Sequence, residues 1–85
     1  RMTTLVLGAG GGVAWAFFAL LDRDAILRGR ALERRWVLVD RGARPPGFAA
    51  ATAFLSPLEC WHCDVRNEHH LEALLRAHAV DEVLD

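Results

Sequence analysis

Residues 5–14 read LVLGAGGGVA and carry the clearest signal for the fold. A short aliphatic run, predicted as a strand over Thr3–Leu7, leads directly into four glycines within five positions. An apolar segment follows without interruption from Val13 onward. A strand that passes through glycines into a helix makes a tight turn with backbone N–H groups exposed at the helix start. The stretch therefore predicts a strand–turn–helix unit at the start of an α/β domain.

Two spacings of small residues in this turn are compatible with a site for a pyrophosphate. The spacing G-x-G-x-x-G would use Gly8, Gly10 and Val13, and its third position is not small. The spacing G-x-x-G-x-x-A would use Gly8, Gly11 and Ala14, and all three positions fit. We prefer the second spacing, and a turn without a ligand is its alternative. A P-loop is excluded because the chain contains no lysine.

The first helix is predicted from position 11 or 12 to position 27 or 28, with Gly29 marking its end. Its first half, Val13–Leu21, is apolar on all sides, which predicts that it is buried all round. The connector over residues 30–35 is polar. A loop is predicted over residues 41–47 and a short helix over residues 48–55.

The rest of the chain continues the alternation of strands and helices. Strands are predicted at Trp36–Val39, Leu58–Cys63 and Val80–Leu84, and a helix at Glu68–His78 with Asn67 as its cap. This order predicts a parallel sheet with helices on both faces, a three-layer Rossmann-like α/β fold. The fourth strand should pair beside the first. With about four strands, residues 1–85 are interpreted as the N-terminal part of a dinucleotide-binding domain.

Acidic residues follow the second and third predicted strands. Asp40 ends the second strand, where a carboxylate can accept hydrogen bonds from the adenosine ribose. It lies about thirty residues after the glycines, against a usual spacing of about 20 residues. Arg41 beside it would attract a 2′-phosphate that Asp40 would repel, so we expect NAD or NADP, with NAD slightly favoured. Asp64 and Val65 are expected beside the adenine, although Asp64 is equally compatible with a simple helix-capping role.

Five stretches of the chain together carry a resemblance to a known family: Leu7–Ala14, Val37–Asp40, Cys63–Val65, Leu71–Leu75 and Val80–Leu84. They resemble the NAD(P)-binding N-terminal domain of saccharopine-dehydrogenase-like oxidoreductases. The pattern is also similar to extended short-chain dehydrogenases and epimerases, and the polar extension after the first helix is similar to homoserine dehydrogenases. The resemblance implies that the glycine turn holds the pyrophosphate, Asp40 meets the ribose, and Asp64 and Val65 lie by the adenine.

We predict an oxidoreductase whose catalytic residues lie outside this chain. Short-chain dehydrogenases use a tyrosine and a lysine, and the chain contains neither. Residues 1–85 alone are therefore not expected to turn over a substrate. A nucleotide-sensing Rossmann module and a structural α/β domain are the alternatives. The predicted cofactor-binding residues are Gly8, Ala9, Gly10, Gly11, Gly12, Val13, Ala14, Asp40, Arg41, Asp64 and Val65.

Composition bounds the partners. Ten arginines, spread along the chain, are offset by eleven acidic residues, so no nucleic-acid partner is expected. No apolar stretch reaches the roughly 20 residues of a membrane-spanning helix. Cys60, His62 and Cys63 are residue types that bind zinc, but on a strand the two cysteines face opposite sides, so we expect no metal site. Two cysteines without a secretory context indicate a reduced, cytoplasmic chain. Half a domain leaves strand edges and apolar helix faces uncovered, and we expect self-association through this uncovered half of the sheet.

Overall fold

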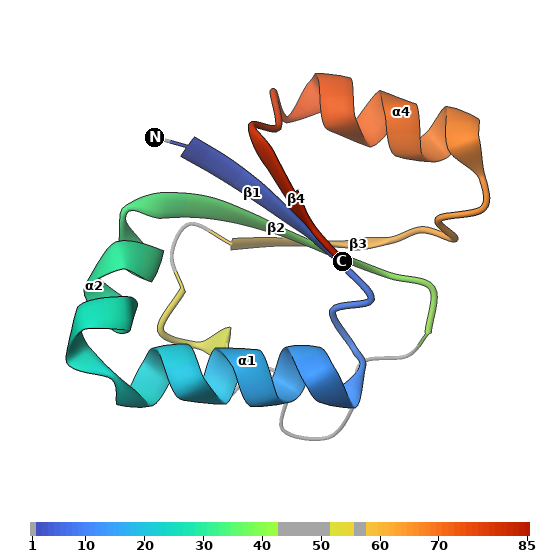
Figure 1. Ribbon diagram of the computed structural model, residues 1–85. Helices are drawn as coiled ribbons and strands as arrows, with labels where there is room; N and C mark the ends of the chain where they lie inside the picture. Colours follow the sequence, from blue (N-terminus) through green and yellow to red (C-terminus); the bar gives the residue numbers. More distant parts are fainter. Residues whose placement is uncertain (1, 43–51, 56–57) are drawn as a thin grey trace.

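The computed structural model describes residues 2–42, 52–55 and 58–85, without the side chains of residues 58, 59 and 62. In chain order the elements are β1 (Met2–Leu7), α1 (Gly12–Arg23), α2 (Ala25–Leu32), β2 (Arg34–Asp40), β3 (Leu58–His62), α4 (Glu68–Ala77) and β4 (Glu82–Leu84) (Figure 1). The strands form one sheet in the order β3-β2-β1-β4, and every neighbouring pair is parallel. The predicted α/β architecture is confirmed, including the pairing of the fourth strand with the first.

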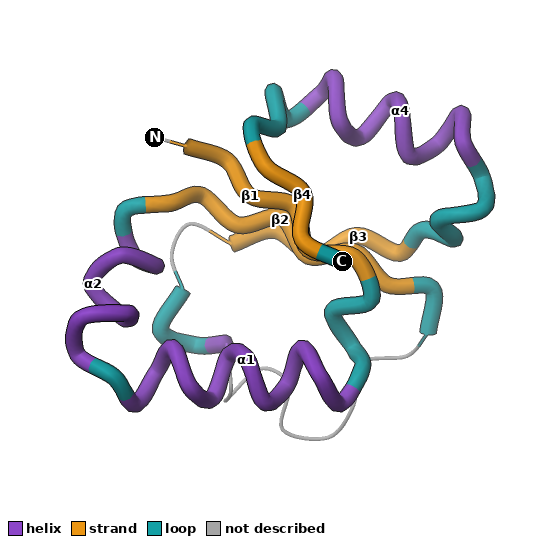
Figure 2. The backbone as a smooth tube through the Cα atoms, in the orientation of Figure 1, coloured by secondary structure: helices purple, strands orange, loops and turns teal. Residues whose placement is uncertain are grey.

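The helices cover both faces of the sheet, with α1 and α2 on one side and α4 on the other (Figure 2). The cause is the right-handed sense of strand–helix–strand crossovers. The chain steps from β1 to β2 in one direction and from β3 to β4 in the other, so the two connections lie on opposite faces. The order 3-2-1-4 is that of the first four strands of a doubly wound, Rossmann-like sheet.

Each face of the sheet has its own apolar core. On the α1 side, Phe18 packs edge-on against Trp36 with ring centroids 6.1 Å apart, and the indole N–H donates to the Ala31 carbonyl over 2.8 Å. On the α4 side, buried side chains of the sheet meet those of the helix and of its preceding loop: Leu5, Val37, Val39, Cys63 and Leu74. The central strands are therefore apolar on both sides, as is typical of parallel sheets.

The first helix differs from its prediction. A break at Asp24 divides the expected single helix into α1 and α2, and Gly29 lies inside α2 rather than at an end. The Asp24 carboxylate accepts from the N–H groups of Ile26 and Leu27, at 3.0 Å each. A short acidic side chain that bonds the following backbone competes with a continuous helix and caps a new one.

The prediction that Val13–Leu21 is buried all round is also wrong. Three residues of α1 are buried against the sheet: Ala14, Phe18 and Leu21. The exposed fraction is 88% for Val13 and 55% for Leu20. No described element covers this outer surface, so an apolar stripe remains at the protein surface.

The remaining element predictions hold with shifted ends. The helix capped by Asn67 is confirmed, since its side chain accepts from the His70 N–H over 3.2 Å. The second strand begins two residues earlier than expected, the third ends one residue earlier, and the fourth is shortened to three residues. Most of the predicted loop over 41–47 and helix over 48–55 lies outside the described residues.

Candidate functional site

The carboxyl ends of β1, β2 and β4 meet at one edge of the sheet. There β1 is flanked by β2 and β4, whose connecting helices lie on opposite faces. A crevice opens at such a point because the two crossovers diverge from it, and parallel α/β sheets commonly bind ligands there. The predicted glycine turn and Asp40 both lie at this edge.

The glycine turn has the geometry of the second predicted spacing. Gly8 has a φ of +66°, which favours glycine, and its carbonyl accepts from the Gly11 N–H over 3.0 Å. A Cβ on Gly11 would lie 3.3 Å from that same carbonyl oxygen, so the turn is tight there. Ala14 is buried against the sheet whereas Val13 points outward. The small residue that permits close helix–sheet packing is thus Ala14.

The start of α1 is open to an anion. Its cap residue, Gly11, provides no side-chain hydrogen bond, and the first turn contains no acidic residue. The N–H groups of Gly12, Val13 and Ala14 precede the first intrahelical bond, which the Trp15 N–H makes to the Gly11 carbonyl. These donors and the positive end of the helix dipole favour a negatively charged group.

Asp40 lies beside the glycine turn. One carboxylate oxygen, Oδ2, accepts from the Gly10 N–H over 2.6 Å, and the other, Oδ1, accepts from the Gly42 N–H over 2.8 Å. The Gly42 bond and, to a smaller extent, the Gly10 bond and the Arg41 charge outweigh burial and lower the pKa of Asp40. The group is therefore a carboxylate at neutral pH. The backbone N–H of Arg41 is a third donor to it, and its roughly four lone-pair positions leave room for a further donor.

Asp64 forms a small charged cluster after β3. Arg66 donates to it through its side chain, 2.7 Å from Nη2 to Oδ2, and through its backbone N–H. Arg66 first, and more weakly Arg41 with its Nη1 3.9 Å from Oδ2, lower the pKa of Asp64, which in turn raises that of Arg66. Asp64 thus orders the loop before α4 and holds two guanidinium groups near the crevice.

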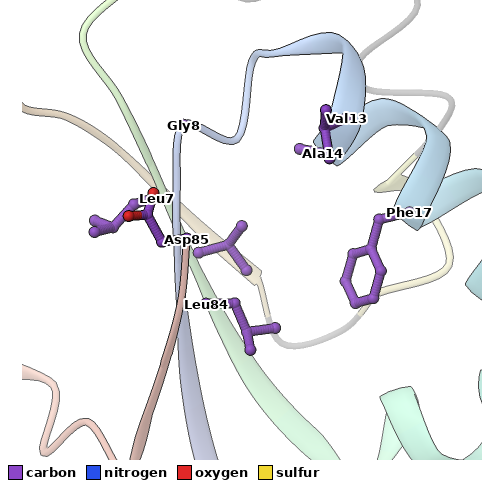
Figure 3. Close-up of a pocket in the computed structure, with 8 residues that line it drawn as sticks. Leu7, Gly8, Val13, Ala14, Phe17, Leu84 and Asp85 are labelled. Carbon is purple, nitrogen blue, oxygen red and sulfur yellow. The ribbon is translucent and has the colours of Figure 1, made fainter.

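Two hollows flank the ends of β1 and β4. The smaller, of about 220 Å³, lies toward β2 and is lined by Leu7, Gly8, Asp40, Arg41, Cys63, Val65 and Asp85. The larger, of about 420 Å³, lies toward α1 and is mostly apolar. Figure 3 shows Phe17 of α1 across this larger hollow from Leu84 of β4. Leu7, Gly8 and Asp85 border both hollows, so the two are adjacent.

The hollows bring together most of the predicted residues but not all. The smaller one includes Gly8, Asp40, Arg41 and Val65, and the larger one includes Gly8, Val13 and Ala14. Ala9 is instead 3% exposed and belongs to the core. The Asp64 carboxylate is engaged by Arg66 and does not border either hollow. Gly10, Gly11 and Gly12 also border neither hollow.

Six lining residues were not predicted as site residues: Val6, Leu7, Phe17, Cys63, Leu84 and Asp85. Phe17 and Cys63 read as core residues in the sequence. Leu84 and Asp85 carry a usable signal, because Leu84 ends and Asp85 follows the strand that is predicted to pair beside the first one. A residue at that place must lie at the same edge of the sheet as the glycine turn.

The two cysteines lie on opposite sides of the sheet, as the strand pattern predicts. Cys60 packs on the α1 side and Cys63 on the α4 side, and both are free thiols. Within the described residues no three histidine, cysteine or acidic side chains are grouped as metal ligands, and no helix is long and apolar enough to cross a membrane. The side chain of His62 is outside the description.

No protein-family model, curated protein or solved structure matches this chain.

Proposed function

We propose that this chain binds the adenosine-diphosphate part of NAD or NADP. The contact between Gly10 and Asp40 carries the proposal, because it places a strand-end carboxylate directly against a glycine turn thirty residues away in sequence. An anion-receptive helix start and a hydroxyl-accepting carboxylate at one edge of a parallel sheet match the two ends of a ribose diphosphate.

The geometry supports a specific arrangement of the ligand. The pyrophosphate oxygens accept hydrogen bonds from the N–H groups at the start of α1, since these N–H groups have no intrahelical acceptors. Asp40 accepts from the ribose hydroxyls through its remaining lone pairs. The adenine occupies the hollow of about 220 Å³ beside Val65 and Cys63. Arg41 lines the same hollow near the ribose.

We further propose a modest preference for NAD over NADP. A 2′-phosphate would lie close to the Asp40 carboxylate, whose lowered pKa keeps it charged at neutral pH. Arg41 would offset this repulsion, but its guanidinium already lies 3.9 Å from the Asp64 carboxylate. The two effects act in opposite directions, and the preference is accordingly small.

We propose that the bound cofactor serves hydride transfer, and that the chain is part of an NAD(P)-dependent oxidoreductase of the saccharopine-dehydrogenase-like kind that acts in the cytoplasm. The apolar hollow of about 420 Å³ next to the turn offers room for the nicotinamide end. The cofactor supplies the hydride chemistry, and the protein orients it. The alternative is a nucleotide-sensing module, which would bind the cofactor at the same site without catalysis. Substrate turnover by a longer chain would identify the enzyme and exclude the sensor.

Calorimetric titration with ADP-ribose, NADH and NADPH tests the binding proposal. We expect saturable binding of all three, tighter for NADH than for NADPH, and weaker binding by Asp40→Ala. Asp22→Ala is the matched control, because it removes the same charge at the far end of α1. Absence of heat with every ligand, from a chain shown to be folded by circular dichroism, would refute the proposal.

We also propose that the chain self-associates through α1. Val13, Ala16, Phe17 and Leu20 recur at helical spacing and form a stripe without charges, bordered by the larger hollow. The same apolar stripe on two copies can meet about a twofold axis, as a symmetric dimer requires. A right-handed crossover that extended the sheet beyond β4 would lie on the α4 side and leave this stripe uncovered.

Sedimentation over a range of concentrations tests the self-association. We expect a concentration-dependent dimer for the wild type and a monomer for Leu20→Glu. Ile26→Glu is the control, since it makes the same change at a residue that is 71% exposed on α2, away from the stripe. A wild type that remains monomeric at every concentration would contradict the proposal.

A further inference from the structure

The glycine turn is held in place by a charge from another strand. The Gly10 N–H donates to Asp40 Oδ2 over 2.6 Å, while Oδ1 of the same carboxylate accepts from the Gly42 N–H. The Asp40 carbonyl also accepts from the Cys63 N–H over 3.0 Å. Asp40 therefore joins the segments that follow β1, β2 and β3. Hydrogen bonds from a backbone N–H to a carboxylate are short and stronger than neutral ones.

The turn needs such support because of its composition. Fixing a glycine backbone costs more conformational entropy than fixing any other residue, and three glycines follow one another at positions 10–12. The residues on either side of Gly10 are held by main-chain bonds, from the Ala9 N–H to the Val39 carbonyl over 3.1 Å and from the Gly11 N–H to the Gly8 carbonyl. At Gly10 itself the acceptor is the Asp40 side chain.

We propose that Asp40 is a positioning residue for the glycine turn, acting through the Gly10 N–H to hold the shape that receives a diphosphate, in addition to meeting the ribose. This inference rests on the proposed function and deepens it. Both roles fit one carboxylate, because its roughly four lone-pair positions exceed the three backbone N–H groups that bond to it. The diphosphate then uses the donors at the start of α1, and the Gly10 N–H stays with Asp40.

A ligand without a ribose separates the two roles. If Asp40 acted on the ribose alone, its removal would leave inorganic pyrophosphate binding unchanged or tighten it, since a negative charge near the site would be lost. If Asp40 positions the turn, its removal weakens pyrophosphate binding. Only the positioning role thus predicts that the variant binds pyrophosphate more weakly than the wild type.

The first experiment is calorimetric titration of inorganic pyrophosphate into the wild type, Asp40→Ala and Asp22→Ala. We expect Asp40→Ala to bind about tenfold more weakly, the effect of one charge-assisted hydrogen bond. Asp22→Ala removes the same charge at the far end of α1, without a bond to the turn, and should bind as tightly as the wild type. Equal or tighter binding by Asp40→Ala would overturn the proposal.

The second experiment needs no ligand. In amide hydrogen exchange followed by NMR, we expect the Gly10 amide to exchange at least about tenfold faster in Asp40→Ala, while the Ala9 amide keeps its protection. Unchanged exchange at Gly10 would show that Asp40 does not hold the glycine turn. If Asp40→Ala does not fold, Asp40→Asn, which keeps one acceptor oxygen, should give smaller changes in the same directions.

The two proposals fail in different ways. A wild type that binds neither pyrophosphate nor a dinucleotide refutes the proposed function, and the Gly10 amide still decides whether Asp40 holds the turn. A wild type that binds, with Gly10 exchange insensitive to Asp40, refutes the positioning role alone.

Discussion

Replacement of Gly8 by alanine should destabilise the fold without creating a steric contact. A Cβ at Gly8 would have no atom within 4 Å, so the cost comes from the backbone alone, whose φ is +66°. The left-handed conformation costs an L-residue about 1–2 kcal/mol, and the reduced freedom of the unfolded chain offsets about 0.4–1 kcal/mol of this. The expected net loss in the free energy of unfolding is therefore about 1 kcal/mol.

Gly12→Ala is the matched control four residues away. Its Cβ would also have no atom within 4 Å, but Gly12 begins a helix and its φ is not positive. There alanine should stabilise the fold by about 0.5–1 kcal/mol. The two variants thus differ in sign although both add one methyl group to the same turn.

Urea unfolding measures both variants. Trp36 is 3% exposed and reports loss of the core by fluorescence, and circular dichroism reports the helices. With a slope of about 1 kcal/mol per molar urea, the midpoint of Gly8→Ala should fall by about 1 M and that of Gly12→Ala should rise. Gly8→Asn should recover part of the loss, because asparagine tolerates positive φ. Equal midpoints for Gly8→Ala and Gly12→Ala would show that the backbone conformation at Gly8 imposes no cost on alanine.

Three further outcomes are expected. Asp24→Ala should lose about 1 kcal/mol of stability and helical signal, because it removes the cap of α2; Asp22→Ala, in the same urea experiment, should change little. Phe18→Ala should lose about 3–5 kcal/mol, since its ring is 1% exposed in the larger core, and thermal unfolding should show a large fall in midpoint. The pKa of Asp40 is lowered in the folded chain, so its contribution to stability is present above its usual pKa of about 3.9. This contribution is lost as the pH falls through the lowered value. Unfolding measured over a range of pH should show a weaker acid dependence for Asp40→Asn than for the wild type.

Local patterns in the sequence determined much of this architecture. The strand–glycine–helix stretch around Gly8, the cap at Asn67 and the alternation of apolar runs with helical segments predict a parallel α/β sheet, and the structure has that sheet. The glycine turn and the helix cap depend on residues a few positions apart. The apolar runs depend on which face of a strand or helix each side chain occupies. For the observed strand order, the right-handed crossover rule then places α1 and α4 on opposite faces of the sheet.

Tertiary structure decided the features that join distant segments. The bond between Gly10 and Asp40, the hollow that includes Val65 and the ion pair of Arg41 with Asp64 each depend on how three strand ends converge. The break at Asp24 is local, but the sequence is compatible both with one continuous helix and with a second helix that the Asp24 side chain caps. The exposed stripe on α1 follows from which elements pack against that helix, and hydrophobic pattern alone does not specify this.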